Sequence, residues 1–354
     1  MKFRYVFFSL LSVLVLSLAF CGCSATSGGS NPEANHGTYT YLGTQSPGDV
    51  WSWVIGTGTF TGTNETTSMT YEGTFVSLAS GFLKATITSA NDPNVPTDGT
   101  AVFYCLEFPN TMLLVGSGGV NENPIICAAK AASAPSAGQY NWLNIPTSGW
   151  SPGDTSYGST EVTVDTVNNL FDFYVSTYDI SGNLEEIITY EGFSFSEGRM
   201  AKSGETLQIF MTPSGLFMGD NGPGNGGLVG AAKQTIDMAD VASKNYRGVM
   251  YEFDAATGDA SVDPIGGEPH PTVSGAIRGF AYSDLDNNTI DSSDYATLTF
   301  SGQDADGIVA GAMATSSHTY DFKMVVSQVN NKYIVMGIAV VAGSNPLYFL
   351  IVEI

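Results

Sequence analysis

Five oxygen-bearing side chains lie close together near the end of the chain. They are Asp284, Asp286, Asn288, Asp291 and Asp294. Carboxylates at such short spacing repel one another, and this repulsion lowers stability unless a cation or water screens it. The segment lies between two strand-like runs, so we expect it at the tip of a hairpin. Its residue types therefore suit either a polar turn or a cation site.

The same spacing resembles the calcium loop of EF-hands and dockerins. Those loops place oxygen ligands at positions 1, 3, 5, 9 and 12, with a glycine at position 6. Asp284, Asp286 and Asn288 match the first three ligands, and deletion of the glycine brings Asp291 and Asp294 into register with the last two. The resemblance implies a calcium site, although this chain lacks the glycine and the flanking helices. A polar hairpin tip without metal is the alternative interpretation.

Two further motifs match enzyme signatures but fail on physical grounds. GWSPG at 149–153 has the G-x-S-x-G pattern of a hydrolase nucleophile elbow. That elbow needs the backbone N–H after the serine, and Pro152 has none. GPGNGG at 222–227 matches G-x-G-x-x-G, but no helix follows it to receive a pyrophosphate. We interpret both motifs as turns.

Two acidic residues recur at matching places in the sequence. TYEG occurs at 70–73 and at 189–192, and the weaker TFSG occurs at 299–302. Serine replaces the glutamate in the third copy, which argues against catalysis by this carboxylate. No histidine pair or cysteine pair has zinc-ligand spacing. The sequence therefore predicts no catalytic residue.

The two cysteines beyond residue 23 are predicted to be buried thiols. Cys105 and Cys127 lie in strand-like runs with a third such run between them. In a meander the outer strands are about 9.6 Å apart, whereas a disulfide needs Cα atoms within about 7 Å. Alignment of the repeats described below pairs Cys105 with Ile209 and Val326, which are core types.

Composition restricts the partners of the chain. The 354 residues carry a net charge of −22, and only 13% of them are charged. This acidity argues against nucleic acid and against electrostatic docking on anionic lipids, because both need a basic face. Gly, Thr, Ser, Asn, Tyr and Phe are abundant, which favours strands and turns.

Three segments of similar length repeat along the chain. GTYTYL at 37, GQYNWL at 138 and GVMYEF at 248 begin them, and each ends with a hairpin and an apolar strand. ICAAK at 126–130 and VGAAK at 229–233 are near copies. The predicted units are residues 37–137, 138–247 and 248–354. A period near 100 residues is typical of whole domains, not of solenoid or propeller repeats.

Each unit shows short strand-like runs separated by Gly, Pro, Asn and Asp, with no helical period. The fold class is therefore all-β, with three tandem antiparallel β-barrel or sandwich units. Lipocalin-like up-and-down barrels are preferred, because the hairpins follow one another without long crossovers. The sequence leaves open whether these are separate barrels or one closed fold.

The N-terminus has the form of an export signal. Lys2 and Arg4 precede an apolar run that is too short to span a membrane comfortably, and LAFCGC follows at 18–23. This end resembles the lipobox of bacterial lipoproteins, whose cysteine receives a diacylglyceride. Cys23 follows the small Gly22 and fits better than Cys21. The resemblance implies a signal peptide at 1–22, a flexible tether at 23–36 and an outer-membrane lipoprotein facing the periplasm or the cell surface.

Three functional hypotheses follow from the sequence. The first is a non-enzymatic lipoprotein that is anchored to the membrane and binds a small apolar ligand or an envelope protein, or shapes the cell surface. The second is an exported hydrolase of polysaccharide or peptide, which needs two facing carboxylates about 5–9 Å apart. The third is a calcium-stabilised adhesin. No cofactor other than calcium is indicated.

Overall fold

The computed structural model describes residues 39–354, except 46–48, 57, 66, 94, 109–110, 118–124, 130–132, 146–154, 221–226, 255–258 and 341–345. The predicted signal peptide, the tether, Cys21 and Cys23 therefore lie outside the described residues. So do the GWSPG motif and most of the GPGNGG motif.

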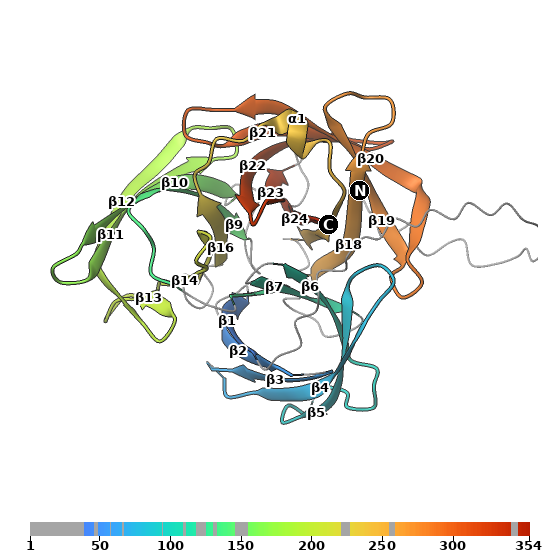
Figure 1. The fold of residues 1–354 in the computed structure, drawn as a ribbon, viewed down its shortest axis with the longest axis horizontal. Helices are drawn as coiled ribbons and strands as arrows, with labels where there is room; N and C mark the ends of the chain where they lie inside the picture. The colour runs from blue at the N-terminus through green and yellow to red at the C-terminus, as the bar shows by residue number, and fades with distance from the viewer. Residues whose placement is uncertain are drawn as a thin grey trace, which may run out of the picture.

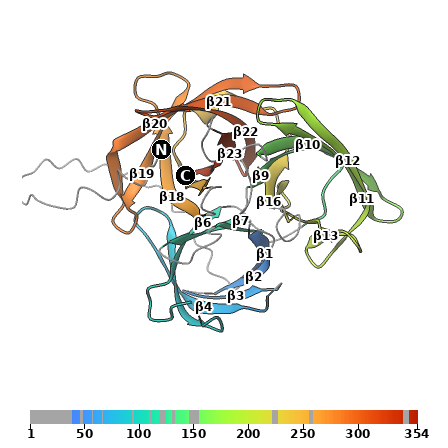
Figure 2. The same ribbon diagram turned by 180° about the vertical axis from the view of Figure 1, so that it is seen from behind.

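The chain forms three closed antiparallel barrels of eight strands each, arranged around a common centre (Figure 1). In every barrel, each strand pairs with the next along the chain and the last pairs with the first. The predicted all-β fold with three up-and-down barrels is thus confirmed. The repeats are separately closed barrels, which answers the question that the sequence left open. Figure 2 shows the same arrangement from behind.

The strands of the first barrel are β1 (Tyr39–Gln45), β2 (Asp49–Ile55), β3 (Thr59–Asn64), β4 (Thr70–Ser77), β5 (Leu83–Ala90), β6 (Val102–Phe108), β7 (Thr111–Ser117) and β8 (Ile125–Ala129). The second barrel contains β9 (Gly138–Ile145), β10 (Ser156–Asp165), β11 (Leu170–Asp179), β12 (Leu184–Ser196), β13 (Arg199–Ala201), β14 (Gln208–Met211), β15 (Leu216–Asp220) and β16 (Gly227–Ala232).

The third barrel contains β17 (Tyr246–Asp254), β18 (Asp259–Pro269), β19 (Ala276–Asp284), β20 (Thr289–Gln303), β21 (Val309–Ala314), β22 (Thr319–Val329), β23 (Lys332–Val340) and β24 (Pro346–Glu353). Its first strand begins at Tyr246, two residues before the predicted start of the third unit. A short helix, α1 (Met238–Val241), precedes it and is capped by the Asp237 side chain, which accepts from the Ala239 N–H.

The repeated TYEG and TFSG segments lie in the fourth strand of each barrel, where the ladder is irregular. The register shifts beside Gly73 in β4, beside Gly192 in β12 and beside Gly302 in β20. Gly192 and Gly302 have positive φ values of 72° and 102°. Such bulges bend a strand and increase its twist, which helps a sheet close into a barrel. The motif is therefore explained by strand curvature.

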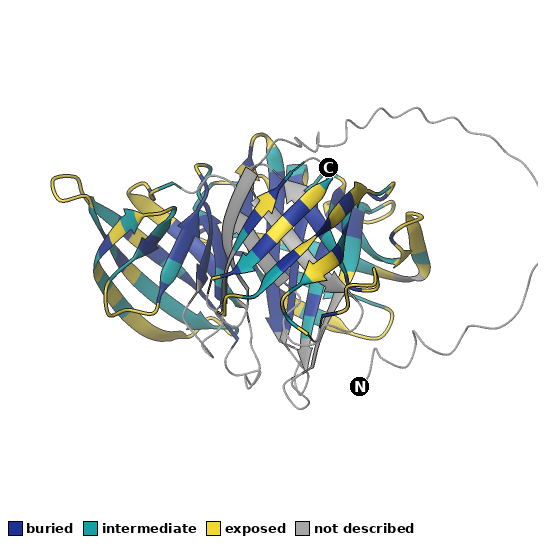
Figure 3. Cartoon of the chain, turned by 90° about the horizontal axis from the view of Figure 1, so that it is seen from below, coloured by how far each residue is buried: buried dark blue, intermediate teal, exposed yellow. Residues whose placement is uncertain are grey.

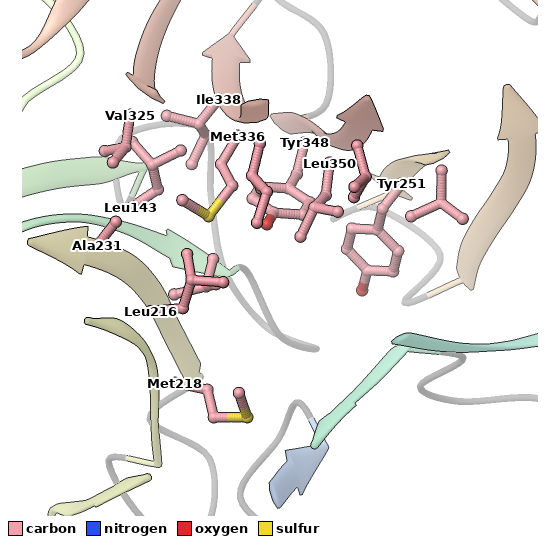
Figure 4. Close-up of a cluster of buried hydrophobic side chains, with 14 of the residues drawn as sticks. Leu143, Leu216, Met218, Ala231, Tyr251, Val325, Met336, Ile338, Tyr348 and Leu350 are labelled. Atoms are coloured by element: carbon pink, nitrogen blue, oxygen red, sulfur yellow. The ribbon is translucent and has the colours of Figure 1, made fainter. Parts of the chain in front are cut away.

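Inside each barrel, alternate residues of the strands point inward and form a core of their own. These three interior cores are separate hydrophobic clusters. A fourth cluster of 21 buried residues lies between the barrels and draws side chains from all three. Figure 4 shows part of it, where the second and third barrels meet. It includes Leu143 and Met218 of the second barrel and Ile338 and Leu350 of the third. The outer faces of the barrels are thus partly buried against one another.

The contacts between barrels involve particular strands. β9 lies against β22 and β23, β16 lies against β22, β8 lies against β14 and β15, and β7 lies against β18. Ion pairs add to these contacts: Arg199 bonds Glu65 at 3.2 Å, and Lys84 bonds Asp286 at 2.5 Å. Away from this centre, β12 leaves many side chains exposed, whereas most of those on β11 are half-buried (Figure 3).

Candidate functional site

The second barrel encloses a cavity of about 390 Å³, whereas the cavity described inside the first barrel holds about 10 Å³. A volume of 300–1,000 Å³ is typical of sites for small molecules. The cavity is therefore large enough for an organic ligand. It is the candidate functional site.

Strand alternation determines which side chains reach this cavity. On β9 the inward residues are Tyr140, Trp142 and Asn144, each two positions from the next. On β10 the same rule brings Thr160 and Val162 inward, while Glu161 between them is exposed. The period of two in each strand thus produces one continuous inner wall.

Aromatic side chains form much of that wall, and their neighbours hold them in place. Trp142 pairs with Gly158 across the strands, and an added Cβ at Gly158 would lie 2.3 Å from the indole ring. The Tyr140 hydroxyl donates to the Ser136 carbonyl at 3.0 Å, and its ring meets Phe217 edge-on at 6.0 Å. These contacts keep a preformed apolar surface facing the cavity.

One amide gives the apolar cavity a polar group. The Asn144 Nδ2 donates to the Ser156 hydroxyl at 3.1 Å. The Asn144 Oδ1 atom is buried and has no hydrogen-bond partner among the described residues. A buried acceptor without a partner costs about 1–3 kcal/mol. This oxygen is buried away from the cavity, so the amide presents no open acceptor to a ligand inside it.

The cavity opens through a weak place in the barrel wall. β13 has three residues, and its only described pair with β14 is Met200 with Ile209. The corresponding strand β21 of the third barrel makes six pairs with its neighbour. The segment between β13 and β14 carries Glu205 and Thr206, which are exposed and also line the cavity. Solvent therefore reaches the cavity beside this segment.

Negative charge surrounds this opening. Glu205 is the one charged side chain among the described lining residues, so no Lys, Arg or His lines that part of the cavity. Burial raises the pKa of Tyr190, and the nearby carboxylates of Glu186 and Glu205 raise it further. Lys202 lies 3.8 Å from the Glu205 carboxylate and partly offsets it.

Of the predicted calcium residues, Asp284, Asp286 and Asn288 lie at the β19–β20 hairpin tip, whereas Asp291 and Asp294 lie within β20. Asp284 accepts from the Asn287 backbone N–H at 3.1 Å and from its Nδ2 at 2.7 Å, which lowers the pKa of Asp284. Asp286 turns toward the first barrel, where Lys84 donates to it. Asn288 has a φ of 55°, typical of a tight turn.

The same carboxylates are thus engaged by protein groups. Lys84 donates a hydrogen bond to Asp286, and this bond raises the pKa of Lys84. Asp291 lies in β20 and is half-buried, and the Asp294 side chain lies outside the described residues. Within the described part of the chain, no three His, Cys, Asp or Glu residues form a group that could hold a metal ion.

Cys105 lies in β6 and Cys127 in β8, with β7 paired between them, as the meander predicted. The Cys105 side chain is buried in the interior core of the first barrel. Ile209 and Val326 lie in the sixth strands of their own barrels and are also buried. The alignment that paired these three residues is therefore confirmed, and Cys105 occupies a core position.

Sequence reasoning missed the cavity. Its only signal was the run KSGET at 202–206, which interrupts the fifth strand of the second unit with turn-forming residues. The corresponding strands β5 and β21 are longer, with eight and six residues. A gap in the strand pattern of one repeat was thus visible, but its effect on the barrel interior was not.

Comparisons with known proteins add little to this picture. The chain matches no family model, and no curated protein matches it. One similar solved structure is a protein of unknown function from the DUF3598 family of Nostoc punctiforme. It is 11% identical, with a TM-score of 0.24, and the match covers 62% of this chain and 95% of the other. No helix among the described residues is long and apolar enough to cross a membrane.

Proposed function

We propose that this chain is a non-enzymatic, exported lipoprotein whose second barrel binds a small apolar molecule. The observation that carries the proposal is the cavity of about 390 Å³ with aromatic walls inside the second barrel. Burial of apolar ligand surface contributes about 25 cal/mol per Å². Walls that are already ordered reduce the entropy lost on binding.

The arrangement of charges favours binding over hydrolysis. A glycoside hydrolase of the usual kind needs two carboxylates flanking the scissile bond. The described lining of the cavity contains one carboxylate, Glu205, at its edge. The lipid anchor at Cys23 and the location in the outer membrane rest on the lipobox resemblance and belong to the same proposal.

A fluorescent apolar probe tests the binding site. N-phenyl-1-naphthylamine is expected to bind at one site per chain, with increased emission and energy transfer from Trp142. Thr160→Phe should weaken binding at least about tenfold, because Thr160 is 8% exposed and lines the cavity. Glu161→Phe adds the same ring to the outer face and serves as the matched control. Equal binding by both variants would place the probe elsewhere and refute the proposal.

A further inference from the structure

The charge at the edge of the cavity restricts the class of ligand. We infer that the second barrel selects uncharged apolar molecules and rejects organic anions such as fatty acids. This inference rests on the proposed binding function and specifies its ligand.

The first step concerns charge. A ligand that enters beside the segment between β13 and β14 passes Glu205, which is exposed and lines the cavity. An anionic head group inside would lose its hydration and would meet no cationic side chain among the described lining residues. Lys202 lies 3.8 Å from the Glu205 carboxylate, so the charge of this lysine is already paired. An anion is therefore disfavoured both at the opening and in the interior.

The second step concerns hydrogen bonding. The Asn144 amide lines the cavity, but its Nδ2 already donates to the Ser156 hydroxyl and its Oδ1 is buried away from the cavity. This amide therefore offers an anionic head group little in place of the water that it would lose on entry.

Two probes that share one aromatic skeleton test this selection. N-phenyl-1-naphthylamine is neutral, and its 5-sulfonate adds a negative charge while it leaves the N–H free. On the intact chain, the neutral probe should bind about tenfold more tightly than the sulfonate. Equal or tighter binding of the sulfonate would overturn the charge selection.

Variants assign the preference to its residue. Glu205→Gln should improve binding of the sulfonate about threefold relative to the neutral probe, whereas Glu185→Gln, an exposed position on β12 outside the cavity lining, should leave the ratio of the two affinities unchanged. An unchanged ratio in Glu205→Gln would overturn the role of this carboxylate. If neither probe binds, or if Thr160→Phe has no effect on them, the binding function itself fails.

Discussion

Replacement of Ile338 by alanine tests whether the three barrels share one core. Ile338 has no exposed surface and lies in the cluster between the barrels, on β23 (Figure 4). Truncation of a buried isoleucine to alanine costs about 2–5 kcal/mol, from lost burial and from the cavity left behind. We expect a loss in that range, because β23 is packed against β9 and little room exists for the neighbours to relax.

Denaturant unfolding measures this loss, and hydrogen exchange locates it. The Ile338→Ala variant should lose amide protection in β9 of the second barrel as well as in β23 and β24 of the third. Ile290→Ala provides the control of the same type, because Ile290 is 38% exposed, and it should change stability by about 0.5 kcal/mol or less.

A second comparison separates shared from local packing. Ile87 also has no exposed surface but lies in the interior core of the first barrel. Ile87→Ala should cost a similar free energy, with the loss of protection greatest in the first barrel. The reasoning would be refuted if Ile338→Ala left β9 fully protected, or if it cost no more than the Ile290→Ala control.

Four further predictions follow. Cys23→Ala should leave an unprocessed precursor without palmitate label; a labelled variant would move the lipid to another residue. Millimolar calcium should raise the melting temperature more than magnesium does, and the double variant Asp284→Asn, Asp286→Asn should abolish this rise. Identical melting temperatures with calcium and with chelator would show that the hairpin tip is a polar turn without a metal site. A fragment that begins at Tyr246 should melt below the whole chain, since it exposes its share of the central cluster; an equal melting temperature would show that the barrels are independent. Burial raises the pKa of Tyr333 to about 12, together with the hydrogen bond from its hydroxyl to the Asp240 carboxylate. The unfolded chain therefore loses this proton at a lower pH than the folded chain, and the free energy of unfolding should fall as pH rises from about 10 through 12. Melting temperatures across this range should fall less in Tyr333→Phe than in the unchanged protein.

Local pattern was sufficient for much of the fold. Runs such as QYNWLNI alternate inward and outward residues, and Gly, Asn and Asp mark the turns between strands, so the sequence predicted three up-and-down units. The match of Cys105 with Ile209 and Val326 was also readable from the repeat. These features depend on neighbours along the chain or in the next hairpin, and a single sequence contains that information.

The candidate site depended on longer distances. The strands β23 and β24, KYIVMGIAV and PLYFLIVE, are apolar on both faces, which indicates burial on both sides but does not name the second partner. Only the tertiary structure shows that the other barrels cover the outer face. Likewise, the cavity is lined by side chains from strands that are distant in the sequence, such as β9, β12 and β15. Void volume is a property of many side chains packed together, and no local pattern specifies it.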